Sequence, residues 1–102
     1  MTKKTLVMWR HIPAQIIISR GRRKAKKILS DRFQKAIDRA AMIADRADSS
    51  DYLEDWHRIE ERLNSDKPID QLLELEASLL EIAYDGDRLD TLIKAGGLHQ
   101  EE

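Results

Sequence analysis

Residues 5–29 read TLVMWRHIPAQIIISRGRRKAKKIL, and this stretch decides the fold that we predict. Apolar and β-branched residues alternate from Thr5 to Arg10, which favours an extended strand. Pro13-Ala14 suits the centre of a turn, because proline fixes φ near about −65°, and an isoleucine-rich second strand follows over 15–19. Arg20-Gly21 predicts the next turn. The lysines of 24–29 are typical of an exposed edge strand. The sequence therefore predicts a three-stranded antiparallel β-meander.

After residue 29 the apolar spacing changes to that of helices. Ser30 is the expected N-cap of a first helix with an alanine-rich inner face. A second helix is predicted from Ser49 or Ser50 to Leu63, with Trp56 and Ile59 pointing inward. Pro68 opens a third helix, whose apolar residues cover more than one narrow stripe.

The run Asp85-Gly86-Asp87 closes the third helix and caps a fourth over 88–95. The predicted fold class is α+β, with the three-stranded antiparallel β-meander at the N-terminus packed against three to four α-helices. We expect a single domain over residues 1–97 and a flexible C-terminal tail over 98–102.

The charges are distributed unevenly along a chain whose net charge is only −1. Residues 1–35 contain 11 Lys and Arg and one acidic residue, whereas residues 36–102 contain 7 Lys and Arg and 18 acidic residues. Packing of the two parts would cancel much of this asymmetry. No apolar run is long enough to span a bilayer and no secretory signal is visible, so we expect a cytoplasmic protein with no membrane partner.

No catalytic or metal-binding pattern stands out. His11, His57 and His99 are far apart, and only His57 has a predicted helical neighbour of ligand type, Glu61. Two ligands are too few for a zinc site, and the chain has no Cys. Neither a nucleophile elbow nor a glycine-rich phosphate loop occurs. We expect no metal, no cofactor and no independent enzymatic activity, although acid–base chemistry stays open.

The strongest local signal is the basic ribbon of residues 20–27, in which six of eight residues are cations. It could neutralise nucleic-acid phosphates, but it contains no stacking aromatic residues and the pI of the chain is about 6.3. It could instead be a solvated edge, or a docking site for an acidic protein surface or a polyanionic cofactor tail. Trp9 and Trp56 are expected in the core, with an interface as the alternative.

Several strings in the chain resemble a known family. They are WRHIPAQ at 9–15, RGRRKAK at 20–26, AIDRAAM at 36–42 and DYLEDW at 51–56. The chain is similar over nearly its whole length to a small bacterial family called "virulence factor". Members of this family are often encoded near genes of folate and corrinoid one-carbon metabolism. The resemblance implies a partner such as a methylenetetrahydrofolate reductase-like protein or a methyltransferase, and it supplies no catalytic residues.

We therefore expect a non-catalytic accessory protein that binds a larger enzyme, or a homo-oligomer. The alternatives are a nucleic-acid-binding or regulatory module that uses the hairpin 20–27, and a small folate-binding enzyme subunit. The candidate partner-binding residues lie in the first turn, the basic ribbon and the third helix: Trp9, Arg10, His11, Gln15, Arg20, Arg22, Arg23, Lys24, Lys26, Lys27, Leu75 and Leu79.

Overall fold

The structure is a computed structural model that describes residues 1–47 and 49–98. The elements follow in the order β1 (Thr2–Trp9), β2 (Ile12–Arg20), β3 (Arg23–Ile28), α1 (Asp31–Ile43), α2 (Ser49–Glu54), β4 (Trp56–Leu63), α3 (Ile69–Ala83) and α4 (Gly86–Lys94). The predicted α+β class is confirmed. Beyond Leu98, the tail predicted over 98–102 lies outside the described residues.

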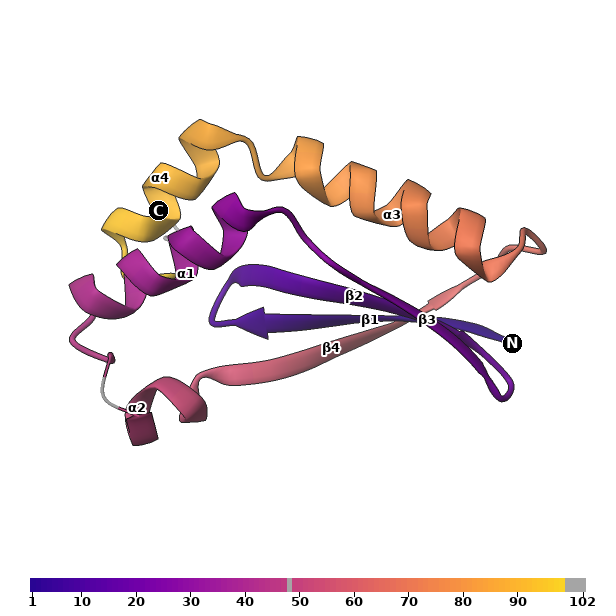
Figure 1. The fold of residues 1–102 in the computed structure, drawn as a ribbon, viewed down its shortest axis with the longest axis horizontal. Coiled ribbons are helices and arrows are strands. Elements are labelled where there is room, and N and C mark those ends of the chain that lie inside the picture. Colours follow the sequence, from indigo (N-terminus) through magenta and orange to yellow (C-terminus); the bar gives the residue numbers. More distant parts are fainter. Residues whose placement is uncertain (48, 99–102) are drawn as a thin grey trace.

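The strands form one antiparallel sheet in the order β3-β2-β1-β4. The meander β1-β2-β3 is present as predicted, but a fourth strand joins the free side of β1 (Figure 1). The prediction of three strands was therefore one short. β1 and β2 are the central strands, and β3 and β4 form the two edges.

The prediction of a helix that runs as far as Leu63 was wrong, because α2 ends at Glu54 and β4 follows. Ile59 and Leu63 are four residues apart, a spacing that fits a helical face and also one face of a strand. Charged residues on both faces of β4 hide its period of two. Pairing with β1 over the whole length of β4 selects the strand. Trp56 is consequently half-buried at the start of β4.

The first turn lies earlier than predicted. Arg10 and His11 form it, with Arg10 at φ 51°, and Pro13 is a buried residue of β2. Val7 pairs with Gln15 but Met8 pairs with Pro13, so Ala14 is an extra residue that forms a β-bulge. Proline cannot donate a hydrogen bond within a sheet, and a bulge is one of the few places where a strand accepts it.

In Figure 1, α1, α3 and α4 lie together on one side of the strands, and α2 lies at the start of β4. α3 packs across β2 and β3, α1 packs on β2, and α4 packs on α1. The largest fully buried side chains include Trp9, Phe33 and Ile16. They belong to one apolar cluster, to which both the sheet and three of the helices, α1, α3 and α4, contribute.

Side chains join the helix ends. Ser30 precedes α1 as predicted, but its hydroxyl donates to Glu81 of α3 at 2.7 Å instead of capping α1. The Ser30 N–H donates to the other oxygen of Glu81 at 2.9 Å. Burial acts to raise the pKa of Glu81, but these bonds and Arg32 outweigh it and hold that pKa below its usual value. At α4 the predicted cap is confirmed, because Asp85 accepts from Arg88 N–H.

Candidate binding surface

On one face of the sheet, strand residues alone line a hollow. The register places Thr5 opposite Ile17 and Glu60, and it places Ile17 opposite Lys26, so these side chains share a face. α3 lies on the other face. A hollow of about 400 Å³ opens on the strand-lined face, which we call the basic face; it is lined by Lys3, Thr5, Ile17, Ser19, Lys24, Lys26, Arg58 and Glu60.

The basic face has an excess of positive charge. Glu60 is its one carboxylate, and it pairs with Lys3 at 3.0 Å. Lys24, Lys26 and Arg58 are exposed and have no ion pair with any residue in 1–47 or 49–98. Cations grouped without counter-charges attract anionic groups.

An apolar surface continues the basic face toward α1. Each strand contributes its next residue on the same side: Val7 follows Thr5, Ile28 follows Lys26, and Trp56 precedes Arg58. These residues, together with Gln15 and others, line a second hollow of about 310 Å³. Ile28 is 76% exposed, which is unusual for an isoleucine. The face therefore combines a cationic part with an apolar part.

The strand alternation divides the basic ribbon between the two faces. Lys24 and Lys26 reach the basic face, whereas Lys27 is on the α3 side and pairs with Glu74 at 2.8 Å. Arg22 and Arg23 are exposed at the hairpin turn. The ribbon is therefore not one surface, and only two of its six cations, Lys24 and Lys26, line the basic face.

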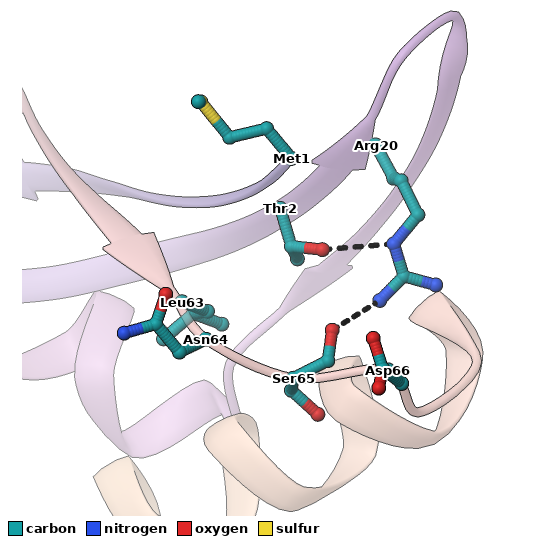
Figure 2. A pocket seen from close by; sticks show the side chains of 7 residues that line it. All are labelled: Met1, Thr2, Arg20, Leu63, Asn64, Ser65 and Asp66. Carbon is teal, nitrogen blue, oxygen red and sulfur yellow. Dashed lines mark hydrogen bonds between the residues drawn. The ribbon is translucent and has the colours of Figure 1, made fainter.

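Arg20 lines the largest hollow of those described, about 680 Å³, which Figure 2 shows. Its Nε donates to the Thr2 hydroxyl at 2.8 Å, and its Nη2 donates to the carbonyls of Ser65 and Lys67. These bonds tie the end of β2 to β1 and to the loop before α3. Arg20 therefore acts here as a structural link, despite the size of the hollow.

Trp9 and its neighbours form a structural junction rather than an open surface. Trp9 is fully buried, its ring stacks on Tyr52 with centroids 5.8 Å apart, and its indole N–H donates to the Tyr52 carbonyl. His11 is exposed, and its backbone N–H donates to the Gly97 carbonyl at 2.8 Å. Gly97 has φ 90°, and a Cβ there would lie 2.7 Å from Trp9 Cζ3. Only glycine fits this position without displacement.

Asp55 holds the same junction together through two arginines. Its Oδ2 accepts from Arg10 Nε at 3.1 Å and from Arg46 Nε at 2.9 Å, and Arg10 also donates to the Gly96 carbonyl. Burial acts to raise the pKa of Asp55, but the hydrogen bonds from Arg46 and Arg10 outweigh it and hold the pKa below its usual value. The pKa of Arg46 is raised in turn, chiefly by its hydrogen bond to Asp55.

The remaining candidates lie on α3. Leu75, Leu79 and Ile82 are 42%, 51% and 74% exposed, so part of the broad apolar face of α3 reaches solvent. α3 covers the side of the sheet opposite the basic face. One flat partner surface therefore cannot contact both sets of candidates at once.

The histidines remain dispersed. His57 and Glu61 lie on one face of β4 instead of on a helix, and His57 Nε2 is 2.6 Å from the Arg10 carbonyl oxygen. Within residues 1–47 and 49–98, no three His, Asp or Glu side chains are grouped so that they could hold a metal ion. His99 lies outside the described residues. None of the helices in those ranges is long and apolar enough to cross a membrane.

Sequence reasoning missed Lys3 of β1 and the residues that β4 supplies. Lys3 and Arg58 belong to the basic face only because β1 and β4 pair side by side with β2 and β3. Asp55 was visible within the DYLEDW string, yet its two arginine partners come from distant segments. The alternation of β3 could have separated Lys24 and Lys26 from Lys27 at the outset.

A comparison with protein families identifies the chain. The family model described as "Virulence factor" matches residues 7–93, so the chain belongs to the virulence factor family. No curated protein and no solved structure matches it. The family description states no reaction and no ligand.

Proposed function

We propose that this member of the virulence factor family is a non-catalytic binding protein that docks on an acidic protein surface through its basic face. The observation that carries the proposal is the group of Lys24, Lys26 and Arg58, three exposed cations that surround one hollow and form no ion pair with the described residues. A sheet face that only stabilised the fold would gain nothing from grouping like charges. An anionic partner relieves their mutual repulsion.

The neighbouring apolar surface makes a protein a better fit than a nucleic acid. Ile28 and Val7 offer contacts to an aliphatic side chain, and the hollow of the basic face contains no aromatic ring on which a base could stack. Trp56 lines the neighbouring apolar hollow, but it is half-buried and its ring packs against Tyr52. A partner segment with several carboxylates followed by one apolar residue matches both parts of the face. Steering by the cations would speed its association at low salt.

The partner we propose is a larger enzyme of folate- or corrinoid-dependent one-carbon metabolism. The family resemblance supports this choice through the genes that often accompany its members. A methyltransferase and a methylenetetrahydrofolate reductase-like protein are the first partners to test. The chain would bind such an enzyme as an accessory protein.

The test compares two double charge reversals of equal size. The tagged chain is mixed with purified candidate enzymes, and binding is measured by calorimetry for wild type, for Lys24→Glu with Lys26→Glu, and for Lys35→Glu with Arg39→Glu. Lys35 and Arg39 are exposed on α1, away from the basic face, and serve as the control. The proposal requires loss of binding in the first variant and retention in the second.

Single-stranded DNA is the competing probe. If the chain binds it more tightly than any candidate enzyme, and the affinity falls by about 10³ or more between 50 and 200 mM salt, the basic face is a nucleic-acid site and our proposal is wrong. Binding that survives the Lys24 and Lys26 reversals would also overturn the proposal, because another surface would then carry it.

A further inference from the structure

The sheet has two edges of opposite character. β3 forms one edge, and its sequence RKAKKI carries four cations and no acid. β4 forms the other edge, and its sequence WHRIEERL mixes both signs. Cations along an edge repel an approaching copy of the same strand, whereas mixed charges can attract one.

The outer side of β4 is open for pairing. β4 packs on β1 along its length and on α2 at its start (Figure 1). Besides the ladder with β1, no backbone hydrogen bond joins residues 56–63 to the part of the chain that the structure describes. Backbone groups along the outside of β4 can therefore accept another strand. Six of its eight residues are exposed, and the two at its ends, Trp56 and Leu63, are half-buried.

The sequence of β4 is complementary to itself in one antiparallel register. If Ile59 of one copy meets Ile59 of another, Arg58 lies opposite Glu60 on the basic-face side. On the other side, His57 lies opposite Glu61. Trp56 meets Arg62, a pair suited to a cation–π contact. A two-fold axis makes each unlike pair occur twice.

Neighbouring registers are repulsive. When the two-fold axis is perpendicular to the sheet, even-numbered residues of one copy face even-numbered residues of the other, and odd-numbered residues face odd-numbered ones. The nearest alternative registers are therefore centred on the residue before or after Ile59. Centring on Glu60 places Glu60 against Glu60 and Arg58 against Arg62. Centring on Arg58 places Arg58 against Arg58 and Asp55 against Glu61. Like charges directly opposite each other destabilise a strand pair.

We infer that two copies of this chain pair through β4, antiparallel and centred on Ile59, to form a continuous eight-stranded sheet. Ile59 is 46% exposed in the single chain, and the pairing covers it. The two basic faces then lie on the same side of the dimer. A single strand pair is a small interface, so the dissociation constant should be on the order of micromolar. The inference stands independently of the proposed function, because it rests on the edge of β4.

Complementary charge reversals test the pairing. Wild type should sediment as a dimer at about 100 µM and dissociate on dilution. Arg58→Glu places two glutamates opposite each other, and Glu60→Arg does the same with two arginines. Each variant alone should lose at least about tenfold in dimer affinity. An equimolar mixture of the two should restore the dimer, because each introduced charge then faces its opposite.

Lys24→Glu is the matched control, since it makes the same charge change on the same side of the sheet but on β3. It should sediment as wild type does. Circular dichroism of each variant verifies the fold. A wild type that stays monomeric at about 100 µM overturns the inference, as does a dimer that both single variants retain. A mixture that stays monomeric overturns it as well.

Discussion

Replacing Asp55 by Asn removes the carboxylate that joins β4 to the first turn and to the segment after α1. Asp55 Oδ2 accepts from both Arg10 and Arg46, and Oδ1 accepts from Arg46 at 3.3 Å. An amide nitrogen in place of one oxygen cannot accept from a guanidinium group, so at least one of these bonds is lost. The negative charge is lost in every orientation of the amide.

The expected cost follows from the exposure of the three side chains. Asp55 and Arg10 are 18% and 16% exposed, but Arg46 is 30% exposed and partly screened by water. Hydrogen bonds to charged groups contribute about 1.5–3 kcal/mol, and the screening favours the lower part of this range. We expect Asp55→Asn to lower the free energy of unfolding by about 2 kcal/mol at pH 7 in urea melts.

The destabilisation caused by Asp55→Asn should depend on pH. The pKa of Asp55 is lower in the folded chain, so its contribution is fully present above the unfolded pKa of about 4 and is lost as pH falls through the folded value. The gap between wild type and Asp55→Asn should therefore be constant from about pH 5 to 8 and close below about pH 4. Asp66→Asn, at an exposed loop residue without an ion pair in the described chain, should show no gap. A gap below about 0.5 kcal/mol at pH 7, or one that persists in acid, would refute the reasoning.

Two further predictions concern the junction and α3. Gly97→Ala should destabilise the chain by about 2–3 kcal/mol in urea melts, because φ is 90° and the new Cβ meets Trp9. Gly21→Ala, at φ 60° in open space, is the control and should cost only about 1 kcal/mol. Equal costs would show that Trp9 moves away from the new Cβ without loss of stability. Leu79→Glu should change stability by less than about 0.5 kcal/mol, because that side chain is half-exposed. A loss above about 2 kcal/mol would mean that Leu79 is buried.

Local pattern was sufficient for the meander but not for β4. Residues 5–28 carry strand signals on both sides of their turns, although Pro13 led to a first turn predicted too late, and the turn at Gly21 uses the positive φ that glycine allows. In β4 the apolar residues Ile59 and Leu63 fit two periods equally well. What selects the strand is the free side of β1, which is a property of the tertiary structure. Local sequence could not contain that information.

The candidate surface, like the fold, was predictable only in part. The ribbon 20–27 pointed to Lys24 and Lys26, which do reach the basic face. Trp9 and Arg10 are conspicuous in the sequence because they hold a junction, and Trp9 has no exposed surface with which to contact a partner. A distinctive string of residues indicates that its positions are constrained. It does not separate constraint by packing from constraint by binding.

The two surfaces proposed for this chain share two residues, Arg58 and Glu60, and their positions decide whether the surfaces compete. In the inferred dimer Arg58 faces Glu60 of the second copy, whereas Lys24 and Lys26 of β3 stay outside that contact and remain available to an acidic partner. Glu60 pairs with Lys3 in the single chain, and in the inferred dimer it also faces Arg58 of the second copy. Both groups of the Lys3 pair are about half-exposed, and such a pair contributes at most about 1 kcal/mol. Sharing Glu60 therefore costs little and leaves Lys3 freer to bind an anionic partner. The second copy extends the sheet at its edge, whereas the acidic partner covers its face, so the two contacts can form together. The dimer would then present two basic faces to one partner surface.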